Sequence, residues 1–335
     1  MAERLLSIEQ AVVRYDTPSG AITPVDGVDL VINEGETLGL VGESGCGKST
    51  LGRLIIQLAR ANSGAVHFAG RDLQAMSASQ LRSLRKELQV IFQDPRGSLD
   101  PKMSIRQIVA EPLKVHGMAK GDERNRKADE ILEMVGLSSS IGHRRPGQLS
   151  GGQQQRVGIG RALITEPRLV VCDEPVSALD VSVQAQVINL LQDLKERLGV
   201  AYLFISHNLA VVRHLSDRVA VMYLGKIVEQ GPSHDVFARP LHPYSRGLLA
   251  SVLRPDTDAP ERLQQATSFI IGDVPSFHDV PSGCRFHPRC PYASDRCREE
   301  QPVLEFATGE HAREHSVACH HWEEIIPMPV AVRAK

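Results

Sequence analysis

Apolar and polar residues alternate along the first 32 residues, and this alternation predicts an antiparallel sheet. The apolar positions are Leu6, Ile8, Val12, Val13, Tyr15, Val28, Leu30 and Ile32. A turn is expected at residues 17–20, which read Thr-Pro-Ser-Gly. The apolar run at residues 37–41 then predicts a short buried strand, and residues 49–58 have the spacing of a helix.

Farther along the chain, short apolar runs alternate with helical patterns, which indicates a mostly parallel α/β core. Strands are predicted at residues 88–92, 169–172 and 201–205. Helices are predicted at residues 79–87 and over most of residues 94–164. A hairpin around Gly225 is expected to join strands at residues 219–224 and 226–230. No internal repeat is visible, so these elements belong to one copy of the fold.

The composition changes after Pro232. Residues 240–302 are rich in Pro, His, Arg and Cys, and their hydrophobic periodicity is weak. We therefore predict a first domain at residues 1–235, with a helical part at about 94–164, and a small C-terminal module at residues 236–335. The Asp- and Pro-rich stretch at residues 255–260 is expected to be a linker that leaves this module semi-independent.

Overall composition limits the possible functions. The 335 residues carry a net charge of −2, which gives no support for binding nucleic acid. No apolar run approaches the roughly 18 residues that span a bilayer, and the N-terminus does not resemble a secretory signal. The protein is therefore expected in the cytosol, reaching a membrane only through partners, and its six cysteines are not expected to form disulfides.

A phosphate-binding loop is predicted at residues 42–50, which read GESGCGKST. Gly42, Gly47, Lys48 and Ser49 have the spacing that this motif requires. The remaining loop residues expected to contact the nucleotide are Ser44, Gly45, Cys46 and Thr50. Backbone N–H groups of such a loop hold phosphate oxygens. Lys48 would neutralise the β- and γ-phosphates, and the Ser49 hydroxyl would bind Mg²⁺.

Two carboxylates end the apolar run at residues 169–172. A buried parallel strand delivers the residues at its carboxyl end to the ligand crevice. Asp173 is therefore suited to hold Mg²⁺, and Glu174 is suited to act as general base on the attacking water. Gln93 follows the predicted strand at 88–92, where it could bind Mg²⁺ or orient that water.

The stretch LSGGQ at residues 149–153, together with the phosphate loop, resembles the ATP-binding-cassette superfamily. The resemblance implies a RecA-like core, an antiparallel β subdomain and a helical subdomain. It also implies that Ser150, Gly151, Gly152 and Gln153 close over ATP held by another subunit. Further roles follow from the resemblance: contact with the γ-phosphate for His207, a dimer-interface loop for Asp180, and stacking on adenine for Tyr15.

Three longer stretches, at residues 39–53, 92–101 and 242–249, resemble the ATPases of dipeptide and oligopeptide importers, above all their second ATPase subunit. This resemblance implies a heterodimer of ATPases, two membrane permeases and a solute-binding protein. The chain would then lie peripherally on the cytoplasmic face of the inner membrane. Nickel or other small-solute import remains open, as do a soluble cassette protein of DNA repair or translation and a redox-sensing cassette.

Four cysteines lie in the C-terminal region with the pattern C-x₅-C-x₆-C followed by a fourth cysteine after 21 residues. They are Cys284, Cys290, Cys297 and Cys319. This spacing leaves an iron–sulfur cluster and Zn²⁺ equally open. The importer resemblance implies a 4Fe–4S cluster with a structural role, remote in sequence from the ATP chemistry. Histidines that could substitute as ligands are His287, His315, His320 and His321.

Overall fold

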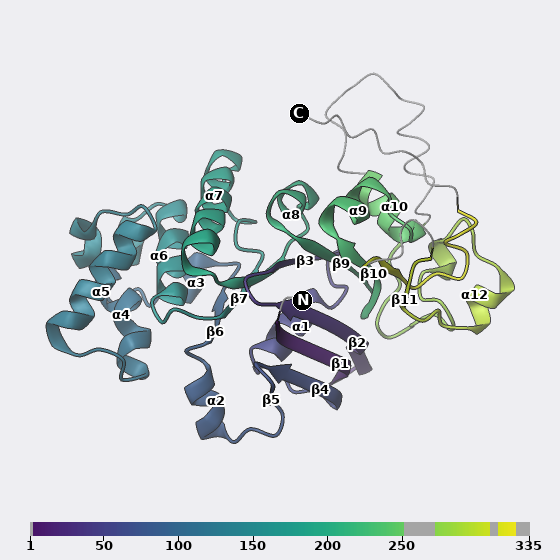
Figure 1. Ribbon diagram of the computed structural model, residues 1–335, viewed down its shortest axis with the longest axis horizontal. Coiled ribbons are helices and arrows are strands. Elements are labelled where there is room, and N and C mark those ends of the chain that lie inside the picture. Colours follow the sequence, from purple (N-terminus) through teal and green to yellow (C-terminus); the bar gives the residue numbers. More distant parts are fainter. Residues whose placement is uncertain (1–2, 251–271, 309–313, 326–335) are drawn as a thin grey trace.

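The computed structural model describes residues 3–250, 272–308 and 314–325, which form two β-sheets and their surrounding helices (Figure 1). The smaller sheet consists, in spatial order, of β2 (Gly20–Asn33), β1 (Arg4–Thr17), β4 (Ser63–Phe68) and β5 (Arg71–Asp72). The larger sheet consists, in spatial order, of β11 (Glu305–Phe306), β12 (Ser316–Val317), β10 (Lys226–Pro232), β9 (Arg218–Tyr223), β3 (Thr37–Val41), β8 (Ala201–Ile205), β7 (Leu169–Asp173) and β6 (Leu88–Ile91).

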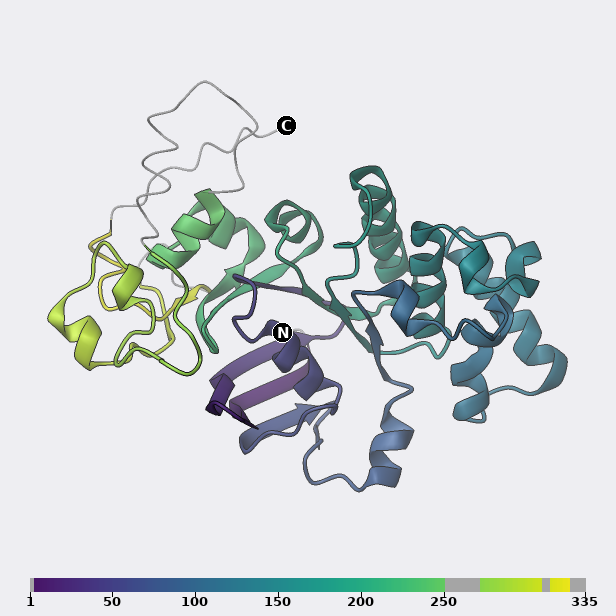
Figure 2. The same ribbon diagram turned by 180° about the vertical axis from the view of Figure 1, so that it is seen from behind.

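The helices divide between the core and a helical region at one end of the molecule (Figures 1 and 2). The helical region contains α3 (Pro95–Ser98), α4 (Ile105–Val115), α5 (Gly121–Met134), the 3₁₀ turns Ser139–His143 and Pro146–Gln148, and α6 (Gly151–Leu163). The other helical elements are α1 (Lys48–Ile55), α2 (Ala78–Leu84), α7 (Val181–Leu198), α8 (Leu209–Leu215), α9 (Ser233–Ala238), α10 (Pro243–Ala250), the 3₁₀ turn His287–Arg289 and α12 (Asp295–Glu299). Within the described residues, no helix combines the length and apolar character that crossing a membrane requires.

The predicted antiparallel sheet is present at the N-terminus. β1 and β2 pair antiparallel, and Thr17 lies opposite Gly20 at the turn between them. The sequence prediction missed β4 and β5, which add to the other edge of β1. Both are short, and residues 63–72 lack a sustained alternation that would have revealed them.

The central strands of the larger sheet, β3 and β8, are buried on both faces. Along β8, Tyr202 and Phe204 join the core that contains the helical region, whereas Leu203 and Ile205 join the core that contains α1 and the smaller sheet. This two-sided burial explains why these strands read as continuous apolar runs rather than as alternating ones. β3 pairs in parallel with β8 and β9, and β7 pairs in parallel with β6 and β8. The carboxyl ends of these strands therefore share one edge.

The C-terminal region shares its core and its sheet with the rest of the chain. β12 pairs antiparallel with β10, and Phe286 packs on Tyr223 and Tyr244 with ring centroids 5.3 and 5.5 Å apart. The expectation of a semi-independent module is therefore not confirmed, and the expected linker at 255–260 lies outside the described residues. Phe286 lies in a turn and β12 has only two residues, so no periodic pattern predicted these contacts. The boundary near residue 235 stays a prediction.

A buried polar cluster anchors this C-terminal region to the sheet. Glu229 of β10 is fully buried and accepts hydrogen bonds from Leu241 N at 2.8 Å and His242 N at 2.9 Å. The His315 ring, also buried, lies with Nε2 2.7 Å from Oε1 of Glu229. Burial alone raises the pKa of Glu229, but the hydrogen bond and charge of His315 and the backbone amides outweigh it and hold that pKa below its usual value.

Candidate active site

The phosphate-binding loop connects β3 to α1, and glycine is required at two of its positions. Gly47 has φ 114°, and a Cβ there would lie 2.0 Å from Pro24 O on β2. A Cβ at Gly42 would lie 2.2 Å from Met222 O on β9. The loop is therefore pressed against the backbone of both sheets, and any side chain at these positions would displace it.

Lys48 lies at the centre of this loop. Its ammonium group donates hydrogen bonds of 2.8 Å to Gly42 O and to Glu43 O. Ser44 and Gly45 are exposed at the tip, whereas Cys46 is buried with Sγ 3.6 Å from Lys48 Nζ. Burial raises the pKa of Cys46, so its thiol stays protonated and unreactive. The charge of Lys48 is thus held where the loop would receive phosphate.

Of the three side chains predicted to bind Mg²⁺, Ser49 and Asp173 meet at the start of α1, whereas Gln93 contacts Glu174. Ser49 Oγ donates a hydrogen bond of 3.0 Å to Asp173 Oδ1, at the end of β7. Burial raises the pKa of Asp173, although the bond from Ser49 opposes that shift. A hydroxyl and a carboxylate beside a phosphate loop are the oxygen donors that Mg²⁺ prefers. Ser49 and Asp173 therefore fit Mg²⁺, the ion that accompanies a bound nucleoside triphosphate. Thr50 is the next residue of α1 and is partly buried.

Glu174 is bracketed by two polar side chains from the neighbouring strands. Gln93 Nε2, after β6, donates to Glu174 Oε2 at 3.0 Å, and His207 Nδ1, after β8, lies 3.2 Å from Glu174 Oε1. Glu174 has φ 49°, a left-handed conformation that is rare and costly for a residue with a side chain. The parallel register of β6, β7 and β8 brings the three residues together.

The LSGGQ stretch forms the N-terminus of α6. Ser150 Oγ accepts from Gln153 N at 3.3 Å, and Gln153 Oε1 accepts from Ser150 N at 3.0 Å. This reciprocal capping box fixes the start of the helix, with Gly151 and Gly152 in its first turn. In both views α6 lies beyond β6 and β7, away from α1 (Figures 1 and 2). The chain does not bring its own LSGGQ to its own phosphate loop.

Two further predicted site residues are exposed. Asp180 is exposed at the N-cap of α7 and makes no side-chain capping bond, and Val181 beside it is 82% exposed. Tyr15 is 37% exposed on β1, opposite Ile22 of β2. Their predicted roles, at an interface and on an adenine ring, both need exposed side chains.

The four C-terminal cysteines line one small cavity, together with His242, His287, His320 and His321. Burial raises the pKa of Cys284 to about 11 and those of Cys290 and Cys319 to about 12. Within the described residues, no three Cys, His, Asp or Glu side chains are arranged to hold a metal ion, so the predicted metal site is not confirmed. His315 was wrongly named as a possible ligand, because it is bound to Glu229.

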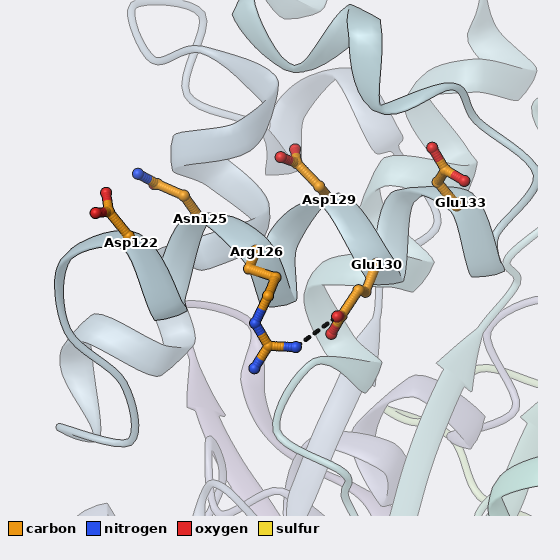
Figure 3. A pocket seen from close by; sticks show the side chains of 6 residues that line it. All are labelled: Asp122, Asn125, Arg126, Asp129, Glu130 and Glu133. Atoms are coloured by element: carbon orange, nitrogen blue, oxygen red, sulfur yellow. Dashed lines mark hydrogen bonds and ion pairs between the residues drawn. The ribbon is translucent and has the colours of Figure 1, made fainter.

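A separate open pocket lies along α5 in the helical region (Figure 3). Its lining side chains all come from this one helix, and the dashed line in Figure 3 marks the 2.6 Å ion pair of Arg126 with Glu130. Asp129 is engaged with Arg106 at 2.8 Å. This is a charged, solvent-facing helix surface, and it contains none of the predicted site residues.

Two contacts from the C-terminal region to the phosphate loop were missed by the sequence analysis. The Tyr244 hydroxyl accepts a hydrogen bond of 2.8 Å from Glu43 N. Arg289 donates to both carboxylate oxygens of Glu43, at 2.8 and 3.0 Å. Tyr244 lies in the stretch 242–249, which supported a resemblance without assigning the residue a role, and no local signal marks Arg289.

Comparison with known proteins agrees with this arrangement. The family model described as ABC transporter matches residues 25–177, and the model described as oligopeptide/dipeptide transporter, C-terminal region, matches residues 228–297. The oligopeptide transport ATP-binding protein AppF of Bacillus subtilis is 50% identical over 302 residues, covering 90% of each chain. The oligopeptide transport ATP-binding protein OppF of Salmonella typhimurium is 48% identical over 326 residues, covering 94% of this chain and 95% of its own.

A solved structure shows the same core. It is a dimeric ATP-binding cassette in a post-hydrolysis state, bound to ADP and Pi, and it is 29% identical to this chain with a TM-score of 0.63. The match covers 68% of this chain and 98% of the solved one.

Proposed function

Because the chain belongs to the ABC transporter family of ATP-binding proteins, we propose that it is the ATP-hydrolysing subunit of an importer of di- and oligopeptides. The main support for ATP hydrolysis is that Gln93 and His207 both contact the carboxylate of Glu174 beside the phosphate loop. The peptide part is supported by the match of residues 228–297 to the oligopeptide/dipeptide transporter region and by the names of the two relatives. Neither the matched models nor those relatives favour nickel import, DNA repair, translation or redox sensing.

The side chains have distinct roles in the proposed hydrolysis of ATP to ADP and phosphate. Lys48 and the loop N–H groups bind the phosphates, and Ser49 and Asp173 hold the Mg²⁺ that screens their charge. Glu174 accepts the proton of the attacking water, and His207 and Gln93 hold Glu174 and the water in place. Because two donors already point at the carboxylate, its orientation is set before the substrate arrives.

We propose that the site is completed by the LSGGQ residues of a second ATPase subunit, in a heterodimer. The solved relative is described as dimeric, and in this chain α6 lies away from α1 (Figure 1). The exposed N-terminus of α6 would present N–H groups and a positive helix end to the γ-phosphate. Asp180 would lie at the same interface, and Tyr15 would stack on the adenine ring.

We further propose a place on the cytoplasmic face of the inner membrane, bound peripherally to two permease subunits that receive peptide from a solute-binding protein. The division into a cassette at residues 1–235 and a C-terminal extension at 236–335 belongs to this proposal. No nucleic acid is expected as a partner, since the net charge is −2. Co-purification of the tagged chain with integral membrane subunits, followed by uptake of labelled peptide, tests the assignment. A stable complex that transports nickel but no peptide would refute the substrate class.

The isolated chain is expected to hydrolyse ATP slowly, because the LSGGQ residues that close over its ATP must come from a second ATPase subunit. At concentrations where the chain is monomeric, turnover should be near background although MgATP still binds. Steady-state ATPase measured across a dilution series, with mass determined by light scattering, checks this expectation. Turnover per chain that stays constant down to the monomer would refute a site completed by a partner.

The four cysteines are proposed to hold a 4Fe–4S cluster, with Zn²⁺ as the alternative. The support is that four thiols from different points of the C-terminal region line one cavity, and thiolate is the ligand that both groups require. A bound cluster would cross-link these segments covalently.

Protein purified without oxygen is expected to be brown, with equal amounts of iron and sulfide. Serine at Cys284, Cys290, Cys297 or Cys319 should remove the colour, whereas serine at the core residue Cys172 should not. Stoichiometric zinc without iron would exclude the cluster but would still support the four cysteines as metal ligands.

A further inference from the structure

The turn between Cys284 and Cys290 is fastened to the nucleotide-binding core by two arginines. Arg285 pairs with Asp26 of β2 and donates to Leu224 O, and its side chain is 11% exposed. Arg289 pairs with Glu43 of the phosphate loop, and its side chain is 5% exposed. Both arginines lie between two cysteines that line the same cavity. This turn therefore touches the cavity on one side and the phosphate loop on the other.

Glu43 is held at every polar group it has. Arg289 binds both carboxylate oxygens in the bidentate arrangement that arginine favours. Tyr244 accepts from the backbone N–H, and Lys48 donates to the backbone carbonyl. The guanidinium of Arg289 also lies 5.8 Å from the centre of the Tyr223 ring. Glu43 thus connects a buried arginine of the C-terminal region to the lysine that receives the phosphates.

We propose that Arg289 is a positioning residue of the phosphate loop, and that the turn between Cys284 and Cys290 couples the cysteine-lined cavity to ATP binding. Arg289 is buried and Glu43 is partly buried. Removing Arg289 leaves the carboxylate of Glu43 unpaired, so Glu43 would turn toward water and carry its backbone with it. The loop would then have to be reordered when ATP binds, which weakens affinity. This inference rests on the nucleotide site and holds whether or not the cavity contains a cluster.

Arg289→Gln and Glu43→Gln are each expected to weaken ATP binding about tenfold, a size typical of coupled neighbours. The double variant should be no weaker than either single variant, because both remove the same contact. In the assembled transporter, KM for ATP should rise while kcat stays nearly unchanged, which distinguishes lost ground-state binding from lost catalysis. Fluorescent ATP titration of the full chain provides the affinities, and Arg296→Gln, at an exposed ion pair of α12, is the matched control.

Thermal unfolding of each variant identifies those that fold. If Arg289→Gln does not fold, Arg289→Lys takes its place, since it keeps the charge but loses the bidentate contact. ATP affinity unchanged in a folded Arg289 variant would overturn the positioning role.

Cys290→Ser tests the coupling to the cavity without altering any group that touches ATP. It is expected to weaken ATP binding about threefold, within the range for residues that act from outside a ligand site. Hydrogen exchange at the amides of residues 43–48 should speed up in parallel. Unchanged affinity and exchange in folded Cys290→Ser protein would overturn the coupling.

Discussion

Glu174→Gln is expected to reduce ATP hydrolysis by about 10²–10⁴-fold, the usual contribution of a general base. Glutamine keeps the size of the side chain and can still contact Gln93 and His207, but it cannot accept the proton of the attacking water. ATP binding should persist, because Lys48 and the loop are unchanged. Dimers should therefore accumulate with bound ATP, measurable by size-exclusion chromatography and by single-turnover hydrolysis in the assembled complex.

Lys48→Ala is the matched variant for this experiment. It removes the charge held over Gly42 O and Glu43 O, so it should weaken ATP binding itself and give no trapped dimer. Near-normal turnover of Glu174→Gln in the assembled complex would show that another group is the base. The left-handed backbone at Glu174 makes this residue costly to keep for structural reasons alone.

Glu229→Ala is expected to lower the free energy of unfolding by about 3–5 kcal/mol, because it leaves several buried groups without their hydrogen-bond partner. The change leaves His315, Leu241 N and His242 N without their acceptor in a region that excludes water. Since these donors belong to the C-terminal region, that region should loosen first. Urea unfolding, combined with proteolysis near residue 240, measures both effects. Equal stability of the variant and the parent chain would contradict this anchoring role.

The same cluster predicts a loss of stability in acid. Burial lowers the pKa of His242 to about 4, and its Nδ1 accepts a hydrogen bond of 3.0 Å from Tyr244 N. In the unfolded chain His242 binds a proton near pH 6.5, whereas in the folded chain it stays neutral until the pH is close to 4. The free energy of unfolding is therefore highest above pH 6.5 and falls as the pH drops toward 4. The loss is about 3 kcal/mol. Glu229, whose folded pKa is also lowered, adds a further loss below its usual pKa of 4.5.

His242→Asn separates these two contributions. The amide oxygen of asparagine can still accept from Tyr244 N but does not titrate near neutral pH. Unfolding midpoints measured between pH 7.5 and 4 should therefore fall less for the variant than for the parent chain. Parallel curves would show that His242 is not the group responsible.

The active-site cluster could be predicted from sequence because each part is local. A glycine-rich loop follows its strand directly, and Gln93, Glu174 and His207 each lie within two residues of a strand end. Parallel pairing brings the carboxyl ends of strands to one edge, and the structure shows that β6, β7 and β8 are neighbours there. By contrast, β4 and β5 escaped notice because β5 has only two residues, and β4 begins with Ser and Gly and buries only Val66 and Phe68.

The contacts of the C-terminal region with the rest of the chain could not be predicted from the sequence. Arg289 meets Glu43 across 246 positions of the chain, and His315 meets Glu229 across 86. Neither partner carries a motif, since an ion pair needs only opposite charge and proximity. Along the sequence the cysteines are remote from the ATP-binding motifs. In the fold, the turn between Cys284 and Cys290 lies against the phosphate loop.

By itself the sequence predicted a mostly parallel α/β core with polar residues at its strand ends, and its motifs carried the resemblance to ATP-binding cassettes, because short motifs and apolar periodicity are visible along the chain. Only the tertiary structure decided how the C-terminal region is used: β12 extends the sheet, Glu229 anchors it, and Arg289 holds Glu43. The physical reason is that burial strengthens these contacts and raises the cost of losing one partner. A single buried pair has a large effect on stability or positioning, yet it leaves no periodic trace along the chain.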